Sequence, residues 1–378
     1  MPFLSFPDGL RSGSAWALLV LLLCLIAPSV GLAGEPYDWP VDEPTYLTSS
    51  FAEYRGDHLH NGVDFSTGRR PGRDVHAVDG GRLDRVFFDP DKYGKTVILV
   101  HENGRRTWYS HLNRFDERVR SQLGGRLDPG DDVTFESGKR FARGERIGTS
   151  GRTGRGPVHL HLALQSPDGS FLNPIGRFSP NLPYNPSPKI KGLNLFPLTG
   201  NTWINGQSKS VRVDGALDDT VELWGTLGVD LTLWNEHSGR TVRSMPTSVR
   251  VLRDGSVVRE LEFDRLSDRV QDTGVHWLFD RQRSNLSPTQ FTVHATPTES
   301  SRWTGLEFTD RGRTGILQFV AETRNGETHS KSVRYKVVAP PVEIQWDHQQ
   351  LRPENPDPVE SVRDAGSGFR FASLSRGQ

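Results

Sequence analysis

Five consecutive residues, Val158-His159-Leu160-His161-Leu162, alternate strictly between apolar and imidazole side chains. Because successive side chains of a β-strand point to opposite faces of the sheet, a strand here turns both histidines to one face and the leucines to the other. Two histidines on an exposed strand face are usually only solvated. The stretch therefore predicts a strand by itself, and a metal site only if other ligands lie close to it.

Two segments earlier in the chain carry such groups. His60-Asn61-Gly62-Val63-Asp64 holds an imidazole and a carboxylate, and Gly62 allows a tight bend between them. Tyr109-Ser110-His111-Leu112 follows the strand-like run Thr96-Val97-Ile98-Leu99-Val100 and places another imidazole at a strand end. Together the histidine motifs offer two nitrogen ligands, one oxygen ligand and two further imidazoles. A hydrolytic zinc site needs three protein ligands and an open fourth position, which this set can supply.

Composition sets the class of protein. A chain of 378 residues is long enough for about two domains of ~150 residues each. Its 46 Lys and Arg residues balance its 46 Asp and Glu residues, so no overall field attracts nucleic acid or a membrane surface. The 39 glycines and 25 prolines exceed the usual ~12% of residues, which favours short strands joined by turns over a helical bundle.

The N-terminus has the pattern of a secretory signal over residues 1–33. The apolar run Ala15–Ala27 is followed by Pro28 and the small-residue ending Gly31-Leu32-Ala33, after which we expect cleavage. An uncleaved anchor is the alternative, but Pro28 keeps the run shorter than the ~18–20 residues of a membrane span. The single cysteine, Cys24, lies inside this run. A mature chain without cysteine would depend on core packing alone.

Composition also divides the rest of the chain. Residues 34–180 are rich in Gly, Asp and Arg and hold seven of the twelve histidines. Residues 181–189 have the character of a linker, because their closely spaced prolines cannot continue a helix or a β-ladder. Residues 339–378 are first Pro-rich and then Gly/Ser-rich, and we expect a loosely ordered tail there.

Residues 190–338 show the period-two alternation of strands. Examples are Val221-Glu222-Leu223-Trp224 and Val229-Asp230-Leu231-Thr232-Leu233-Trp234. The turn signals Asp254-Gly255 and Asn325-Gly326 separate runs of this kind. Short alternating strands with such turns predict an antiparallel, immunoglobulin-like β-sandwich. We therefore expect an all-β protein.

The segment Leu47–Pro174 resembles the lysostaphin/LytM-type zinc endopeptidases, which cut peptide cross-links in bacterial cell walls. The resemblance covers about a third of the chain, and its motifs keep the order and approximate spacing of the family. Besides the histidine motifs above, the matching stretches are Thr48-Ser49-Ser50-Phe51, Tyr93-Gly94-Lys95-Thr96-Val97, Gly144-Glu145-Arg146-Ile147-Gly148 and Ser150-Gly151-Arg152-Thr153-Gly154.

The resemblance implies an antiparallel peptidase domain over residues 34–180, with Zn²⁺ as its cofactor. It gives the chain a complete set of zinc ligands, namely His60, Asp64 and His161. It makes His111 and His159 the two non-ligand histidines that activate water and stabilise the transition state. Tyr54 would assist the oxyanion.

Three features depart from the family pattern. Ala52 stands where glycine is frequent, and Leu162-Ala163 replaces a frequent aromatic–acidic pair after the last ligand. The stretch Asn113–Arg143 is longer than usual and could reshape or gate the groove. Since none of these removes a ligand, they bear on substrate preference more than on activity. Three other histidines have no motif role and are expected to be solvated or structural: His58, His76 and His101.

These observations favour an exported zinc-dependent endopeptidase that hydrolyses cross-link or stem peptides of peptidoglycan. One alternative is a non-enzymatic regulator on the same fold that activates a cell-wall amidase. Such regulators typically lack part of the ligand set, which this chain retains. Another alternative is a secreted peptidase acting on proteins. The expected location is the periplasm or the extracellular space, without a stable membrane span after signal cleavage. The second domain would contribute targeting, through a possible protein partner in the cell envelope.

Overall fold

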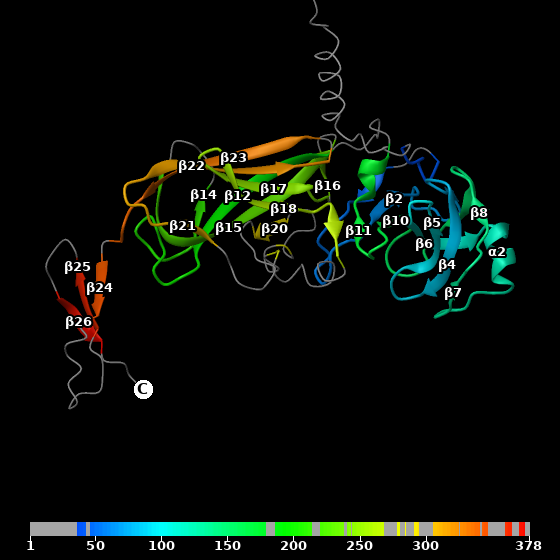
Figure 1. Ribbon diagram of the computed structural model, residues 1–378, viewed down its shortest axis with the longest axis horizontal. Helices are drawn as coiled ribbons and strands as arrows, with labels where there is room; N and C mark the ends of the chain where they lie inside the picture. Colours follow the sequence, from blue (N-terminus) through cyan, green and yellow to red (C-terminus); the bar gives the residue numbers. More distant parts are fainter. Residues whose placement is uncertain are drawn as a thin grey trace, which may run out of the picture. The chain divides into compact units, whose positions relative to one another are not determined.

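The computed structural model describes residues 36–42, 46–178, 186–213, 220–237, 240–242, 244–267, 278–279, 284, 291–294, 305–324, 326–340, 342–346, 360–364 and 370–374 (Figure 1). The predicted signal segment, with Cys24, and the first part of the predicted linker lie outside these residues. The described residues from Asp38 onward belong to one compact unit. Within the described ranges, no helix has both the length and the apolar character that crossing a membrane requires.

The alternating histidine stretch forms β10 (His159–Gln165), as predicted, in the middle of the first sheet. Leu160, Leu162 and Leu164 are buried in the core. The histidine face is buried as well, so these two histidines are not simply solvated. The other main strands are β1 (Leu47–Ser49), β2 (Val63–Ser66), β4 (Gly81–Asp89), β5 (Gly94–Val100), β6 (Arg106–Phe115) and β7 (Asp132–Thr134). Their order is β1-β2-β10-β6-β5-β4-β7, and each neighbouring pair is antiparallel.

Short strands complete this sheet. The pairings are β3 (Asp74–His76) with β9 (Arg146–Ser150), β9 also with β6, β8 (Arg140–Phe141) with β4, and β11 (Phe171–Leu172) with β10. Ser150, at the end of β9, lies opposite Leu112 of β6, next to His111. His111 is therefore inside β6, and the prediction that it lies at a strand end was wrong, because the strand continues to Phe115.

The long stretch Asn113–Arg143 folds against the sheet. Its helix, α2 (Glu117–Leu123), begins after Asp116, whose carboxylate accepts a hydrogen bond from the Arg118 N–H. The helix ends at Gly124, which has the left-handed φ of 69°. The strands of this stretch, β7 and β8, both pair with β4, which β5 and β6 separate from β10 in the strand order. The extra length thus adds a helix and two strands at the side of the sheet away from β2.

Within residues 187–337, β15 (Thr220–His237) joins two sheets. Its first residues pair in parallel with β23 (Thr328–Val337), and its later residues pair antiparallel with β12 (Ser187–Pro197). Gly225 lies between these two parts with φ 83°, and its Cα faces the backbone of Asn201 and Thr202 closely. The two predicted strands within residues 221–234 are therefore one long strand with a glycine bend. The arrangement is consistent with the predicted sandwich.

The other strands of this region follow the predicted alternation. They are β13 (Trp203–Ile204), β14 (Val211–Val213), β16 (Arg240–Val242), β17 (Ser248–Arg253), β18 (Ser256–Glu262), β19 (Arg265–Leu266), β20 (Phe291–His294), β21 (Leu306–Phe308) and β22 (Thr314–Glu322). Asp254-Gly255 forms the turn between β17 and β18, with φ values of 53° and 83°. Positive φ at both positions is the signature of a type I′ hairpin turn, so this turn prediction is confirmed.

Two boundaries differ from the sequence-based expectation. Strand β12 begins at Ser187, inside the predicted linker, because Pro188 lies near the strand end, where a missing N–H is tolerated. The tail contains β24 (Val342–Trp346), β25 (Glu360–Asp364) and β26 (Arg370–Leu374), which form a three-stranded antiparallel sheet. Residues 342–346 alternate apolar and polar side chains, a strand signal that the Pro-rich composition of the tail concealed.

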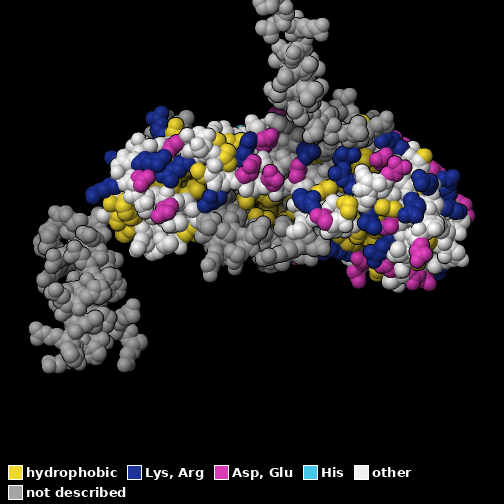
Figure 2. Space-filling view, viewed as in Figure 1, with side chains coloured by type: hydrophobic (Ala, Val, Ile, Leu, Met, Phe, Trp, Pro, Cys, Tyr) yellow, Lys and Arg dark blue, Asp and Glu magenta, His cyan; other side chains and the backbone are white. Residues whose placement is uncertain are grey.

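The first sheet continues into residues of the second region. β19 pairs antiparallel with β11, with Phe171 opposite Leu266. The N–H of Asn173 donates to the Asp264 carbonyl over 2.9 Å, and its side-chain amide donates to Asp264 Oδ1 over 3.0 Å. Basic and acidic side chains are interspersed over the visible face, in keeping with the balanced charge of the sequence (Figure 2).

Candidate metal centre

Strand register brings the first two candidate ligands together. β10 pairs with β2 so that His161 lies opposite Asp64. The strands approach closely at Gly62, where an added Cβ would lie 2.4 Å from the Leu162 carbonyl oxygen and 2.7 Å from Cε1 of His161. Gly62 does not have a positive φ, so its role is to make room for the His161 ring rather than to allow an unusual bend.

A tight hairpin over residues 52–60 positions the third candidate ligand, His60. The His60 N–H donates to the Glu53 carbonyl over 2.9 Å, and the Ala52 N–H donates to the His60 carbonyl over 2.8 Å. The Arg55 N–H donates to the His58 carbonyl over 3.0 Å and closes the loop. Ala52 has φ 57°, a conformation that glycine adopts without strain, which explains the frequent glycine of the resembling family.

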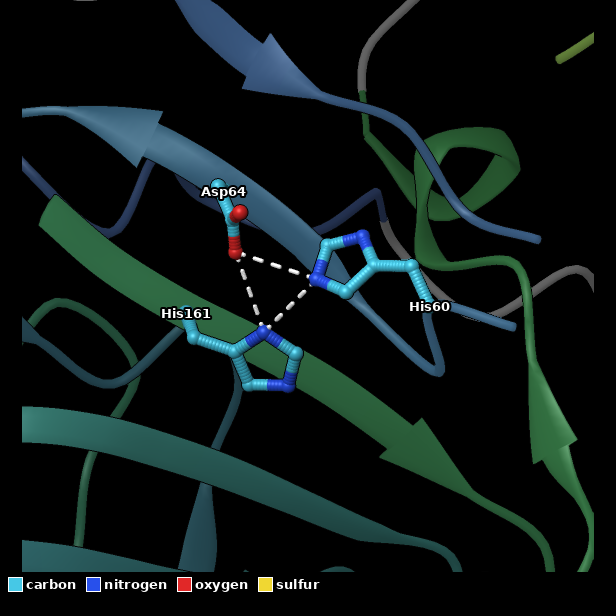
Figure 3. A group of neighbouring side chains, drawn as sticks. All are labelled: His60, Asp64 and His161. Atoms are coloured by element: carbon cyan, nitrogen blue, oxygen red, sulfur yellow. Dashed lines mark hydrogen bonds and ion pairs between the residues drawn. The ribbon is translucent and has the colours of Figure 1, made fainter. Parts of the chain in front are cut away.

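The three ligand atoms form a compact triangle (Figure 3). Nε2 of His60 lies 3.0 Å from Nδ1 of His161 and 3.1 Å from Oδ1 of Asp64. Nδ1 of His161 lies 3.0 Å from the same Oδ1. Tetrahedral zinc with ligands at ~2.0–2.1 Å would separate them by about 3.3 Å, so the triangle is close to the required size. Within the described ranges this is the one group of three such residues with converging ligand atoms.

The protonation states of the three side chains favour binding of a cation between them. The Nδ1–H of His60 donates to the Ser50 carbonyl over 2.7 Å, which leaves Nε2 as an acceptor. Burial lowers the pKa of His60 and lowers that of His161 to about 4. Burial alone would raise the pKa of Asp64, but the charge of His60 and hydrogen bonds from both histidines hold it well below its usual range. A carboxylate and two neutral imidazoles have at most one proton to share among three contacts, whereas a divalent cation binds all three atoms.

The two remaining motif histidines lie beside the triangle. The Nδ1–H of His111 donates to the Thr153 carbonyl and that of His159 to the Pro157 carbonyl, each over 2.7 Å. Their rings are 4.4 Å apart, and Nε2 of His159 is 3.6 Å from Oδ1 of Asp64. Both are buried, and neither Nδ1 is directed at the triangle. Each ring therefore keeps Nε2 as the atom that can take up or donate a proton.

His111 has two further properties of a functional residue. Burial, followed by the neighbouring His159 and His161, lowers its pKa to about 3. Its φ is 61°, which is uncommon for a residue other than glycine and is held here by the His111 N–H bond to the Tyr93 carbonyl over 2.9 Å. The imidazole is thus neutral at physiological pH and fixed in direction.

Tyr54 packs against an aromatic ring of the second region, Phe279. It lies in the 52–60 hairpin with an isolated bridge to Leu59, and its ring packs 5.1 Å from that of Phe279. The side chain is buried. Its assistance to the oxyanion remains a prediction.

The three histidines without a motif role lie in different surroundings, and His101 alone is hydrogen-bonded through both ring nitrogens. His101 contacts the Gly80 carbonyl through Nδ1 at 2.8 Å and the Thr107 hydroxyl through Nε2 at 2.9 Å. His58 pairs with the exposed carboxylate of Asp57 at 2.7 Å, and His76 lies 3.8 Å from that of Asp42.

Sequence reasoning missed the residues that hold the ligands in place. Ser50 and Thr153 act through backbone carbonyls, which carry no signal in residue identity. Arg55 donates to Oδ2 of Asp64 over 3.1 Å, and Asn61 donates to the Tyr93 hydroxyl over 2.8 Å. Asn61 and Tyr93 belong to motifs already recognised, but the motifs gave them no role.

Comparison with known proteins agrees with this geometry. Residues 58–174 match the sequence model of Peptidase family M23. An "Uncharacterized metalloprotease" of Haemophilus influenzae is 30% identical over 118 residues, covering 31% of this chain and 20% of that protein. "Peptidoglycan DD-endopeptidase ShyA" of Vibrio cholerae is 30% identical over 134 residues, covering 33% of this chain and 26% of that protein. The chain therefore spans about a quarter or less of the length of these relatives.

Solved structures with similar parts include a zinc-containing peptidase from Vibrio cholerae, 25% identical with a TM-score of 0.29 and covering 37% of this chain and 40% of that one. The catalytic domain of lysostaphin from Staphylococcus simulans is 23% identical with a TM-score of 0.25 and covers 34% of this chain and 89% of that one. The motif His60–Asp64 and the histidines of β10 both lie within residues 58–174, which match the family model. The match of residues 58–174 to Peptidase family M23 confirms the LytM-type resemblance of this part of the chain.

Proposed function

We propose that this chain is an exported, zinc-dependent endopeptidase that hydrolyses cross-link or stem peptides of peptidoglycan. The observation that carries the proposal is the complete set of His60, Asp64 and His161 with two further histidines directed beside it. A ligand set alone would serve a structural ion. Two additional buried imidazoles, each oriented by a carbonyl, are the groups that proton transfer requires.

The residues divide the work of hydrolysis. His60, Asp64 and His161 would hold Zn²⁺, which lowers the pKa of a bound water toward ~7 and polarises the scissile carbonyl. Nε2 of His111 or His159 accepts a proton as the nucleophile forms and returns it to the leaving amine. The same N–H groups, once protonated, stabilise negative charge developing on the carbonyl oxygen. Burial lowers the pKa of His111 to about 3, so this imidazole is neutral and able to accept that proton.

The M23 match and the printed activity of the ShyA relative support the substrate class. The alternative, a non-enzymatic amidase activator, is disfavoured because such proteins typically lack part of the ligand set, and all three ligand atoms converge here. A secreted peptidase acting on proteins uses the same site and differs only in substrate.

Digestion separates the three functions. The full chain, loaded with one equivalent of Zn²⁺, is incubated with purified peptidoglycan, with casein, and with peptidoglycan plus a cell-wall amidase. We expect new amine termini in peptidoglycan, located by mass spectrometry of the muropeptides, and none in casein. The His161→Ala variant is the inactive control. Casein cleavage alone would identify a protein peptidase, and amidase stimulation that persists in His161→Ala would identify a regulator.

A further inference from the structure

The two oxygens of Asp64 have different partners. Oδ1 faces the nitrogen atoms of His60 and His161 at 3.1 and 3.0 Å. Oδ2 accepts a hydrogen bond from Nη2 of Arg55 over 3.1 Å. A carboxylate can bind a metal ion through one oxygen or through both. Binding through both would require Oδ2, and this oxygen is hydrogen-bonded to the Arg55 guanidinium.

Glu53 contacts the same guanidinium through a different nitrogen. Its Oε1 is 3.4 Å from Nε of Arg55, and its side chain has no exposed surface. A buried carboxylate is costly without a partner of opposite charge. The backbone bonds of the 52–60 hairpin hold Glu53 and Arg55 next to His60, since the Glu53 carbonyl accepts from the His60 N–H. Arg55 therefore bridges a buried carboxylate and a ligand carboxylate.

We propose that Arg55 is a positioning residue that limits Asp64 to one-oxygen metal coordination, and that Glu53 holds Arg55 in place. The proposal rests on the metal-dependent function proposed above. With Oδ2 bound to Arg55, only Oδ1 is directed at the ion, and the coordination position for water stays open. Without the guanidinium, Oδ2 would be free to bind as a fifth ligand and crowd the position of that water. The metal is then retained while turnover falls.

Cobalt substitution tests this in the full chain. Co²⁺ replaces the native ion, and its visible spectrum weakens when a site changes from four to five ligands. We expect Arg55→Gln to bind one Co²⁺ per chain with a weakened visible band, and to lose about 10–100-fold in turnover after reloading with Zn²⁺, as for other residues that orient a ligand. Arg55→Lys keeps the charge and one hydrogen bond, so it should recover part of both signals. Glu53→Gln should shift the spectrum in the same direction as Arg55→Gln.

Arg106→Gln is the matched control. Arg106 also pairs with a carboxylate of the first sheet, Asp84, at 2.8 Å, and it has no contact with the ligands. Its spectrum and turnover should equal those of the wild type. Unfolding temperatures of all variants separate misfolding from a change of coordination, and Arg55→Lys carries the test if Arg55→Gln does not fold.

Three outcomes are decisive. An unchanged cobalt spectrum in folded Arg55→Gln overturns the positioning role, as does a spectrum of Arg55→Lys that departs further from the wild type than that of Arg55→Gln, or loss of Co²⁺ in proportion to loss of fold. A changed spectrum in a protein that cleaves no peptidoglycan supports the positioning role and rejects the proposed substrate. A wild-type chain that binds no Co²⁺ rejects both.

Discussion

Nε2 of His60 and Nδ1 of His161 face one another at 3.0 Å, although 101 residues separate the two histidines in the chain. A proton on both nitrogens would place two like charges in a buried site at this distance, which is strongly unfavourable. The pair is therefore stable either as neutral imidazoles or around a shared cation. The metal-free form and the metal-bound form can be distinguished by chelation of the metal, by substitution of a ligand and by a change of pH.

Loss of a ligand and loss of a proton-transfer group should have different effects. His161→Ala removes a corner of the triangle, so bound zinc and activity should fall together. His111→Ala leaves the triangle intact, so zinc should stay near one per chain while turnover falls about 10²–10⁴-fold. Zinc content by mass spectrometry and muropeptide cleavage are measured on the same folded samples. Zinc lost from His111→Ala but retained by His161→Ala would reverse our assignment.

Gly62→Ala should damage the site through space alone. The new methyl group meets the Leu162 carbonyl and the His161 ring at 2.4 and 2.7 Å, so β2 and β10 must separate. Such overpacking costs about 1–3 kcal/mol of unfolding free energy, and zinc affinity should fall with it. Gly125→Ala is the control, because a Cβ there has no neighbour within 4 Å. Equal denaturant midpoints and zinc affinities for the two variants would disprove the packing role of Gly62.

Acid should destabilise the metal-free protein over a defined range. Unfolding returns histidine to a pKa near ~6.5, whereas burial holds His111 at a pKa of about 3 and His161 at about 4. Between these values the unfolded chain binds protons that the folded chain excludes, so stability falls as pH decreases from 6.5 toward 4. Each such histidine costs up to ~1.4 kcal/mol per pH unit. Urea unfolding in the presence of a chelator measures this slope, and His111→Gln should make it shallower. A slope unchanged in His111→Gln would show that His111 keeps an ordinary pKa.

Asp254→Ala tests whether the second domain is separable from the metal site. The Asp254 carboxylate accepts hydrogen bonds of 2.9 Å from the Ile316 N–H, the Tyr335 hydroxyl and the Arg313 guanidinium, and the residue has a positive φ. The variant should lower the unfolding temperature of residues 187–337 by a few °C. Zinc content should remain that of the wild type. Zinc loss in Asp254→Ala would show that the two regions fold as one unit.

The resemblance to the LytM-type endopeptidases implied which three residues form the triangle, whereas residue identity and strand period alone left two further imidazoles as candidates. His161 and Asp64 are adjacent across β10 and β2, and the alternation at 158–162 already gave the direction of the imidazoles. The helix α2 was not predicted within Asn113–Arg143, although Asp116 and Gly124 are ordinary start and stop signals. A resemblance to other proteins carries no information about an insertion, so only these local signals indicate the helix.

Other features could not have been read from the sequence. Ser50 orients His60 with its carbonyl, and any residue could supply that atom. The pairing of Arg55 with Asp64 depends on the hairpin backbone, which begins at the left-handed Ala52, a residue that ordinarily disfavours this conformation. Gly225 gave no sign that two alternating runs are one strand shared by two sheets.

The place of β10 between β2 and β6 also sets the order in which the molecule can be assembled. Both neighbours precede β10 in the chain, so during synthesis the centre of the sheet stays open until residues 159–165 have emerged. Asp64 is separated from His161 by 97 residues, and the loop between them must close before the two can meet. A nascent or prematurely terminated chain that ends before β10 thus lacks both His161 and the strand that would hold it. The candidate metal site is therefore completed in the same step that completes the sheet.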